Sequence, residues 1–546
     1  MTALPHFLPL LQDRPVLVLG LGASGLAMAD WCGRAGARVT VADNRAAPPQ
    51  ASALAQRCPQ AEVLHSDFGL ALFQQRPWAM VCCSPGLAPH QTEGVVQAAR
   101  AAGVAVVGEL GLFAQALNVL AKPWTSEEPR DPGTPEPEPY KPVVLAITGT
   151  NGKTTVTSLT HQLLERAGWQ VALAGNIGPN LLDVLSRHLA AYAAGEPLPQ
   201  AWVLELSSFQ LNDVQGFNPT AATVLNLSQD HLDWHGTFES YAAAKGHIFG
   251  QKALMLLNRD DAHVMAWRPQ PTTLREGSRT KTLPGRPYVT FGAEAPTRHG
   301  DWGLETVNGM CWLVRAQSVS GAVAEAEAAQ PGAAPSRRRG NAEDDELFMQ
   351  RLMPAEALRI RGRHNATNAL AALALATAAG APLAPMLHGL REYRGEPHRV
   401  EPVAIVNEVE YFDDSKGTNV GATLAAINGL GAERKVVVIL GGEGKGQDFS
   451  PLAPAVARHC RAVVLIGKDG PAIAQALRDG GAQVPQLNAG SLPEAVELAT
   501  AQARPGDAVL LSPACASFDM FRDYQHRAEV FVQAVAARQE AQGMLS

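Results

Sequence analysis

Three segments of the chain combine a continuous apolar run with a glycine-rich turn and a following stretch of helical composition. They are "PVLVLGLGASGLAMADWC" (15–32), "LAITGTNGKTTVTSL" (145–159) and "KVVVILGGEGKGQDFSPLAP" (435–454). A strand that is apolar throughout, instead of alternating with polar residues, is typical of a parallel sheet covered by helices on both faces. Three such strand-turn-helix segments predict three α/β domains.

The spacing of these starts divides the chain. Its 546 residues agree with roughly three domains of about 150 residues each. We expect a Rossmann-like N-terminal domain (1–122), a P-loop-type central domain with a mostly parallel sheet (143–395), and a Rossmann-like C-terminal domain (396–546). Residues 123–142 contain seven prolines and many acids, which predicts an extended linker. Residues 316–346 lack hydrophobic periodicity and predict a surface insertion.

Composition narrows the possible partners. The net charge of −7 argues against nucleic acid, whose phosphates require a basic face. No apolar run approaches ~18 residues, so no membrane insertion is expected. The seven cysteines are scattered without a C-x-x-C pair, and the N-terminus carries no signal-peptide pattern. We therefore expect a cytoplasmic protein.

The turn "TGTNGKTT" (148–155) carries the most specific chemistry. A phosphate cradle needs small residues, a helix N-terminus, a lysine and a hydroxyl for Mg²⁺. Gly149, Gly152, Lys153 and Thr154 supply these, although Ile147 stands where the strict pattern has its first glycine. The turn predicts a nucleoside triphosphate site.

Polar side chains also follow two other predicted strands of the central domain. The run "WVLE" ends in Glu205, and "VLNLSQDHLDWHG" (224–236) contains Asp230, His231 and Asp233. Ligands of an open α/β sheet bind beyond the carboxyl ends of its strands. A metal site is one interpretation, and a solvated or hydrogen-bonded loop is the other.

The N-terminal turn "GLGASG" (20–25) is a G-x-G-x-x-G pattern after a strand, and Asp43 ends the next strand. This pattern indicates a pyrophosphate at a helix N-terminus, which a nicotinamide dinucleotide and a UDP-sugar both carry. The turn "CCSPGLAP" (82–89) could add phosphate contacts.

In the last domain, three turns after strands concentrate charged and hydroxyl groups. They are "VEYFDDSKGTN" (409–419), "GGEGKGQDF" (441–449) and "LLSPACASFDMF" (510–521). Lysines, hydroxyls and backbone N–H groups of this kind would bind a substrate carboxylate.

Taken together, these motifs resemble the Mur ligase family of ATP-dependent amide ligases. "GTNGKT" resembles the family's phosphate loop, and "HNATNALAALALA" (364–376) resembles its helix beside the adenine. The three C-terminal turns are similar to those of the member that adds D-glutamate. The resemblance covers nearly the whole chain; the linker and the insertion depart from it.

The resemblance implies a reaction in peptidoglycan precursor synthesis. ATP phosphorylates the alanyl carboxylate of UDP-N-acetylmuramoyl-L-alanine, and the D-glutamate amine then displaces phosphate. The implied cofactors are ATP and two Mg²⁺ ions, and a monomer is expected. The chemistry is reasonable, because a phosphoryl group gives an unreactive carboxylate a leaving group. A hinge near 393–400 would assemble the site.

The resemblance also implies roles for individual residues, with Lys153, His231 and Lys245 as the catalytic set and Lys245 carbamylated. The implied contacts are Gly149, Thr150, Asn151, Gly152, Lys153, Thr154, Thr155, Asn365, Asn368, Arg399 and Asp414 for ATP; Thr154, Glu205, His231 and Lys245 for metal; Gly22, Ala23, Ser24, Asp43, Arg45, Ser84, Gly86 and Asn176 for the UDP-substrate; and His398, Lys416, Thr418, Lys445, Ser517 and Tyr524 for D-glutamate.

Three alternatives remain open at this point. The first is another amide ligase of the same family, which would add a different amino acid. The second is a nicotinamide-dependent oxidoreductase fused to a P-loop module, which "GLGASG" and Asp43 would support. The third is a nucleotide-binding regulator without catalysis.

Overall fold

The structure, a computed structural model, describes residues 11–122, 139–176, 178–276, 279–283, 285–319, 346–432, 434–541 and 543. The described residues form two compact units. The described residues of Met1–Leu227, His231–Thr290 and Ala371–Met386 form the first unit, and those of Ser228–Asp230, Phe291–Leu370 and Leu387–Ser546 form the second. Each unit is described by itself below.

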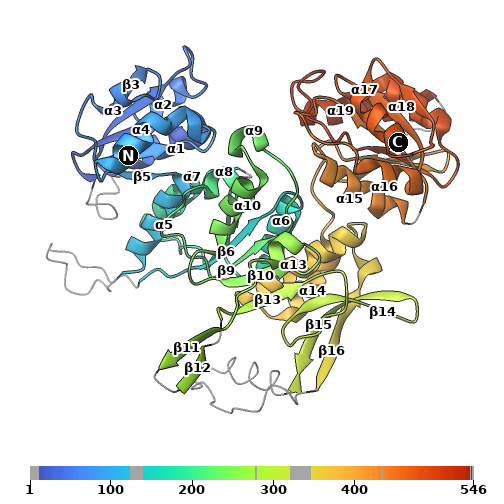
Figure 1. Ribbon diagram of the computed structural model, residues 1–546, viewed down its shortest axis with the longest axis horizontal. Helices are drawn as coiled ribbons and strands as arrows, with labels where there is room; N and C mark the ends of the chain where they lie inside the picture. The colour runs from blue at the N-terminus through green and yellow to red at the C-terminus, as the bar shows by residue number, and fades with distance from the viewer. Residues whose placement is uncertain are drawn as a thin grey trace. The chain divides into compact units, whose positions relative to one another are not determined.

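The first unit begins with a parallel sheet of strand order β3-β2-β1-β4-β5 (Figure 1, blue). Apolar residues of α1, α2 and α5 cover one face of this sheet, and those of α3 and α4 cover the other. The elements are β1 (Pro15–Leu19), α1 (Ala23–Arg34), β2 (Arg38–Asp43), α2 (Ala51–Arg57), β3 (Glu62–His65), α3 (Leu70–Phe73), β4 (Met80–Cys83), α4 (Pro89–Ala101), β5 (Ala105–Val107) and α5 (Glu109–Leu120).

A second sheet follows, with strand order β13-β10-β9-β6-β8-β7. Its pairs β10–β9, β9–β6, β6–β8 and β8–β7 are parallel. The elements are β6 (Val143–Thr148), α6 (Lys153–Arg166), β7 (Val171–Gly175), α7 (Leu181–Ala193), β8 (Ala201–Glu205), α8 (Ser208–Leu211), β9 (Ala221–Val224), α9 (Leu232–His235), α10 (Phe238–Gly246), η2 (His247–Phe249), β10 (Leu254–Asn258), α11 (Ala262–Met265), the antiparallel pair β11 (Thr272–Glu276) and β12 (Arg279–Leu283), and β13 (Tyr288–Phe291).

One hydrophobic core joins these two sheets. Buried residues of α1 and α5 belong to the same cluster as buried residues of α7 and β8. The ring of Phe113 on α5 lies 5.0 Å from that of Trp202 on β8. The Arg57 guanidinium on α2 bridges Asp30 on α1 and Asp183 on α7. The two sheets are therefore packed as one unit.

Residues 123–138 of the expected linker lie outside the described residues, but its end is held in place. The Tyr140 hydroxyl donates to Pro199 O (2.7 Å) and accepts from Trp202 Nε1 (2.8 Å). The Tyr140 N–H donates to Leu120 O at 2.9 Å. The last residues of the range expected as linker are thus part of the folded unit.

The second unit contains an antiparallel sheet, β14-β15-β16, and the C-terminal α/β sheet. The first part of this unit contains β14 (Trp302–Val307), β15 (Met310–Ser318), β16 (Leu347–Pro354) and η3 (Ala355–Ala357). Helices α13 (Arg363–Ala378) and α14 (Leu383–Glu392) follow, and each has residues in both units. Strand β15 continues through Ser318, so residues 316–318 belong to the sheet and not to the expected insertion, and residues 320–345 lie outside the described residues.

The C-terminal sheet has the strand order β17-β18-β22-β19-β20-β21, parallel except for β17–β18 (Figure 1, orange to red). Helices α15, α16 and α17 pack on one face, and α18 and α19 pack on the other. The elements are β17 (Glu401–Val406), β18 (Val409–Asp413), α15 (Val420–Gly431), β19 (Val436–Gly441), α16 (Leu452–His459), β20 (Cys460–Ile466), α17 (Gly470–Asp479), β21 (Gln486–Asn488), α18 (Leu492–Gln502), β22 (Ala508–Leu511) and α19 (Tyr524–Ala541).

The three expected strand-turn-helix starts are confirmed. They correspond to β1–α1, β6–α6 and β19–α16. The apolar runs identified these strands correctly because each is buried on both faces; β19, for example, is buried at every position.

Candidate active site

The predicted phosphate turn connects β6 to α6 at the carboxyl edge of the central sheet. Gly149 (φ +155°) and Gly152 (φ +81°) adopt backbone conformations that favour glycine. A Cβ on Gly149 would lie 3.0 Å from Leu225 Cβ, so the turn passes close to the end of β9. The turn thereby presents the N-terminus of α6, where backbone N–H groups bind anions.

Asn226 holds this turn from the neighbouring strand end. Its side-chain oxygen accepts from Asn151 N–H (2.8 Å), and its carbonyl accepts from Thr150 N–H (2.9 Å). The Lys153 ammonium donates to the carbonyls of Gly149 (2.9 Å) and Thr150 (2.8 Å). The predicted phosphate-binding lysine therefore lies against its own turn, at the helix start.

Glu205 ends β8, the strand paired with β6, and is 2% exposed. Its Oε1 accepts from Asn176 Nδ2 at 2.7 Å. Among the described residues its buried Oε2 has no hydrogen-bond partner. A buried carboxylate oxygen without a partner is unfavourable unless something else occupies it, and carboxylate oxygens are the ligands that Mg²⁺ prefers. The residues present therefore fit a Mg²⁺ site that includes Glu205.

Lys245 on α10 is 2% exposed and contacts the same turn. Its Nζ donates to Gly149 O (2.8 Å) and Thr148 Oγ1 (3.2 Å) and lies 4.8 Å from the centre of the Tyr241 ring. The Tyr241 hydroxyl is 2.9 Å from Thr150 Oγ1. The structure thus brings Lys245 to the phosphate turn, while its carbamylation stays a prediction.

His231 precedes α9 in a left-handed conformation (φ 52°) and is exposed. Its ring lies 4.7 Å from that of Phe209, which in turn stacks on His235 at 5.7 Å. Burial, together with the nearby His231 and Lys245, lowers the pKa of His235 to about 4. His231 belongs to the aromatic cluster beside the turn, and its metal-binding role stays a prediction.

The N-terminal pattern "GLGASG" connects β1 to α1 as expected. A Cβ on Gly25 would lie 1.9 Å from Gly20 O, so this glycine permits the helix to approach the strand. A Cβ on Gly22 or Gly86 would meet open space or a single atom at 4.0 Å, which leaves room beside both turns. The Ser24 hydroxyl donates to Glu109 Oε2 at 2.7 Å.

Asp43 is buried, and its carboxylate is occupied by its own chain. Oδ2 accepts from Leu21 N–H (2.7 Å), and both oxygens bind the Arg45 guanidinium (2.6 and 2.9 Å). The Arg45 hydrogen bonds hold the pKa of Asp43 at about 2, against desolvation. The Arg45 side chain is 49% exposed. This geometry favours Arg45 as the group that meets a phosphate, with Asp43 supporting it and the turn.

For the UDP-substrate that the family resemblance implies, we predict that Asp43→Ala weakens binding. The change leaves the buried Leu21 N–H without its acceptor and releases Arg45, a loss of about 1–3 kcal/mol. We expect the KM for the UDP-substrate to rise about tenfold while the KM for ATP is unchanged, with Asp67→Ala, an exposed residue of the same sheet's loops, as control. Because the folded-state pKa lies below 3.8, the stabilisation by Asp43 is present above about pH 4 and is lost as the pH falls toward 2.

In the second unit, four of the six residues predicted to bind D-glutamate lie around the end of β18; they are His398, Lys416, Thr418 and Tyr524. Lys416 Nζ donates to the Tyr524 hydroxyl (3.2 Å) and lies 4.7 Å from the Tyr524 ring centre. The His398 ring meets the Tyr524 ring edge-on at 6.0 Å. Thr418 follows two residues after Lys416, and its N–H donates to Lys416 O.

Two further predicted residues lie on neighbouring turns of this sheet. Lys445 (φ 51°) is exposed, and its Nζ lies 5.8 Å from the ring centre of Phe518, which is 65% exposed. Ser517, next to Phe518, is 3% exposed. Glu443 and Ala516 pair as an isolated bridge, which connects the turns that carry Lys445 and Ser517.

Of the residues predicted beside the adenosine, Asp414 is the most constrained. Its Oδ2 accepts from Ser512 Oγ (2.6 Å), and a Cβ on Gly417 would lie 2.5 Å from that oxygen. Burial raises the pKa of Asp414 to about 7. Asn365 and Asn368 lie one turn apart on α13, and Asn368 Nδ2 donates to Asn365 Oδ1 (3.1 Å).

Buried Arg527 is a residue that sequence reasoning missed. It is fully buried on α19, and its guanidinium donates to Ser415 Oγ, Ser415 O and Cys515 O at 2.7–3.1 Å. It therefore ties the turn after β18 to the turn after β22. No local motif marks this residue, because its partners are more than ten residues away in sequence.

Comparisons with known proteins identify the family. Three family descriptions match: "Mur ligase MurD-like, N-terminal domain" at residues 14–108, "Mur ligase middle domain" at 147–281 and "Mur ligase, glutamate ligase domain" at 398–515. The chain is 57% identical over 533 residues to a protein of Albidiferax ferrireducens named UDP-N-acetylmuramoylalanine--D-glutamate ligase, covering 98% of both chains. It is 53% identical to a protein of the same name from Burkholderia pseudomallei, covering 96% of this chain and 97% of the relative.

The solved structures support the same fold. The MurF ligase of Thermotoga maritima in complex with ADP aligns with a TM-score of 0.54 at 15% identity, covering 98% of this chain and 97% of that one. The UDP-N-acetylmuramate-alanine ligase MurC of the same organism aligns with a TM-score of 0.50 at 18% identity, covering 96% and 100%.

The family descriptions and the named relatives define a ligase, and the glycine-rich turn and the buried carboxylate at the edge of a parallel sheet are compatible with that class. The chain belongs to the Mur ligase family. The curated relatives that match it over nearly its whole length carry the name of the family's D-glutamate-adding enzyme. No helix among the described residues is long and apolar enough to cross a membrane.

Proposed function

We propose that this protein joins D-glutamate to UDP-N-acetylmuramoyl-L-alanine at the expense of ATP, in peptidoglycan precursor synthesis. The observation that carries the proposal is the similarity to D-glutamate ligases at 53–57% identity over at least 96% of the chain. The proposal places the reaction in the cytoplasm, where ATP is available, and has the enzyme acting as a monomer.

In the first step, an oxygen of the alanyl carboxylate attacks the γ-phosphorus of ATP. A new P–O bond forms, the bond to the β-phosphate oxygen breaks, and ADP leaves with the displaced electron pair. The transferring phosphoryl group gathers negative charge, which the N–H groups at the start of α6 and the Lys153 ammonium stabilise. Mg²⁺, held by Thr154 and Glu205, with His231 and the carbamate of a carbamylated Lys245 beside a second ion, would supply further positive charge.

In the second step, the D-glutamate amine attacks the acyl-phosphate carbon and inorganic phosphate leaves. The carboxylates of D-glutamate need cationic and hydroxyl partners, and the turns after β18, β19 and β22 carry Lys416, Lys445 and Ser517. The rim of the N-terminal sheet, with Arg45 and the room beside Gly22 and Gly86, is proposed to bind the UDP portion.

The experiment that tests the proposal measures ADP release with UDP-N-acetylmuramoyl-L-alanine, with and without D-glutamate. We expect turnover to require both substrates. Replacing D-glutamate by L-alanine, a diamino acid or D-alanyl-D-alanine tests the other amide ligases of the family. Turnover that is faster with one of these, or that is independent of any amino acid, would contradict the proposal.

Lys416 offers a prediction about the amino-acid site. Lys416→Met keeps the aliphatic stem but removes an ammonium that would bind a carboxylate, an interaction of about 1.5–3 kcal/mol. We expect the KM for D-glutamate to rise roughly 10- to 100-fold while the KM for ATP stays within about twofold. Lys435→Met, at an exposed position of the same domain, is the control. An unchanged KM for D-glutamate would remove Lys416 from the site.

A further inference from the structure

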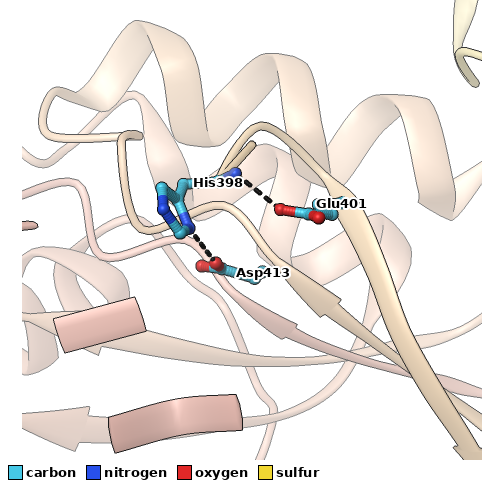
Figure 2. Close-up of side chains that lie close together, drawn as sticks. All are labelled: His398, Glu401 and Asp413. Atoms are coloured by element: carbon cyan, nitrogen blue, oxygen red, sulfur yellow. Dashed lines mark hydrogen bonds and ion pairs between the residues drawn. The ribbon is translucent and has the colours of Figure 1, made fainter. Parts of the chain in front are cut away.

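His398 is held in an unusual conformation by its own chain. Its backbone is left-handed (φ 62°), its N–H donates to Glu401 Oε2 (2.8 Å), and its carbonyl accepts from Lys416 N–H (3.2 Å). A non-glycine residue rarely adopts this conformation unless the surroundings enforce it. The two backbone hydrogen bonds therefore fix where the imidazole is placed, and Figure 2 shows the one to Glu401.

Asp413, at the end of β18, fixes how that imidazole is oriented. Asp413 is 1% exposed, and its Oδ1 accepts from Ser415 N–H at 2.8 Å. Its Oδ2 lies 2.7 Å from His398 Nδ1. Because a carboxylate only accepts hydrogen bonds, Nδ1 carries the proton and Nε2 is left with a lone pair. In Figure 2 the second ring nitrogen points away from both carboxylates.

The cluster of His398, Glu401 and Asp413 also has the composition of a cation site, with ligand atoms within 4.8 Å of one another. Two hydrogen bonds explain this proximity without an ion, because Glu401 binds the backbone of His398 and Asp413 binds its ring. The ring is 24% exposed and faces the Tyr524 ring, whose hydroxyl binds Lys416. The arrangement is that of a carboxylate–imidazole dyad beside the predicted amino-acid pocket.

The proposed reaction creates a need for such a group. Free D-glutamate carries an ammonium at neutral pH, and an ammonium has no lone pair with which to attack an acyl phosphate. A proton must leave the nitrogen first. An imidazole whose Nε2 is an acceptor is a suitable base, since its ordinary pKa lies near neutrality.

We propose that Asp413 and His398 form a dyad in which Nε2 of His398 takes the proton that the incoming D-glutamate ammonium loses. This inference rests on the proposed function. In the step, the N–H bond of the ammonium breaks, its electron pair becomes the nucleophilic lone pair, and the proton adds to Nε2. The resulting imidazolium is stabilised by the Asp413 carboxylate. The amine then forms the C–N bond as the C–O bond to phosphate breaks, the departing phosphate takes the second proton of the nitrogen, and the imidazolium releases its proton to water. His398 is the catalytic residue of this step, and Asp413 positions it.

The charged groups around His398 and Asp413 are compatible with this proton transfer. Glu401 and Asp413 are the acids next to His398, and Lys416 and Tyr524 are the titratable groups on its other side. The buried Arg527 guanidinium acts on Asp413 from α19. Burial raises the pKa of Asp413, while the hydrogen bonds from His398 and Ser415 oppose that rise.

The variant Asp413→Asn tests the orientation of the ring. Ser415 N–H needs an acceptor, so the amide oxygen takes the place of Oδ1 and the amide NH₂ faces His398 Nδ1. The proton then moves to Nε2, which can no longer accept. We expect ¹⁵N NMR of the imidazole to show the Nδ1–H form in the native protein and the Nε2–H form in the variant. The Nε2–H form in the native protein would overturn the proposal.

Hydroxylamine separates the proton transfer from the earlier step. It is largely unprotonated at neutral pH, so it traps an acyl phosphate as a hydroxamate without a base. We expect Asp413→Asn and His398→Gln to lower kcat with D-glutamate about a hundredfold and to form hydroxamate, which needs no D-glutamate, at the native rate. The KM for D-glutamate should change little in Asp413→Asn, because Asp413 acts through His398. The difference in kcat with D-glutamate between the native protein and the two variants should decrease as the pH is raised, because more of the D-glutamate then carries a free amine.

Glu401→Gln is the matched control, since its amide oxygen can still accept from His398 N–H. It should keep both activities and the Nδ1–H form. If the two variants lose hydroxamate formation as strongly as D-glutamate addition, or lose neither, the dyad assignment fails while the proposed function stands. If the native protein forms no hydroxamate from UDP-N-acetylmuramoyl-L-alanine, the proposed function fails and this inference fails with it.

Discussion

Replacement of Lys153 by methionine should reduce turnover at least about a thousandfold, the largest effect of any single change considered for this chain. Lys153 begins α6, and its ammonium lies 2.8–2.9 Å from two carbonyls of the phosphate turn. Methionine keeps the length of the aliphatic chain but removes the only positive charge that the turn itself carries. The developing charge on the transferring phosphoryl group would then lose the positive charge at the start of α6.

The measurement is ADP release at saturating ATP, UDP-substrate and D-glutamate. Lys252→Met, at an exposed lysine of the same unit, should behave as the native protein. A melting temperature within a few degrees of the native value would show that the fold survives, because Lys153 is only partly buried. Native turnover by Lys153→Met would contradict the assignment of the turn to ATP.

Glu205→Gln should lower turnover about a hundredfold or more and raise the Mg²⁺ concentration needed for half-maximal activity. Glutamine can keep the hydrogen bond that Oε1 accepts from Asn176. It replaces the buried Oε2, which has no hydrogen-bond partner among the described residues, by an NH₂ group that does not bind a cation. The substitution thus removes one ligand atom and leaves the packing almost unchanged.

The same variant has an opposite expected effect on stability. Without Mg²⁺, a buried carboxylate oxygen lacking a partner destabilises the fold, so Glu205→Gln should melt at the same temperature as the native protein or higher. With Mg²⁺ added, only the native protein should gain stability. Glu196→Gln, at an exposed position, is the control for both measurements. Equal stabilisation of Glu205→Gln by Mg²⁺ would place the ion elsewhere.

The sequence predicted the strands best where burial is two-sided. Strands β1, β6, β8 and β19 are apolar at nearly every position, and each was found from that run. The end of β15 was missed, because Arg315 and Gln317 look like loop residues. Ala316 is nevertheless buried there, and Arg315 packs over the Trp302 ring at 5.2 Å, which local composition does not reveal.

Site residues were predicted where they follow a strand within a turn motif. Lys153, Glu205, Lys416 and Ser517 are of this kind, and their assignments to ligands stay predictions. The supporting residues were missed because their partners are distant in sequence. Asn226 holds a turn 75 residues away, and Glu109 accepts from Ser24 85 residues away. Such contacts can be predicted only when the order of the strands in the sheet is known, although both residues do follow strands.

The single core shared by α5, α7 and β8 has a consequence for dissecting the molecule. If the chain were cut between residues 122 and 139, each fragment would expose a hydrophobic surface that is buried in the intact protein. This surface includes Phe113 on the N-terminal fragment and Trp202 on the C-terminal fragment. We therefore expect each fragment to aggregate when it is expressed alone. Co-expression of the two fragments should give a soluble complex. In calorimetry of the intact protein, the two sheets of the first unit should unfold together in one transition rather than in two.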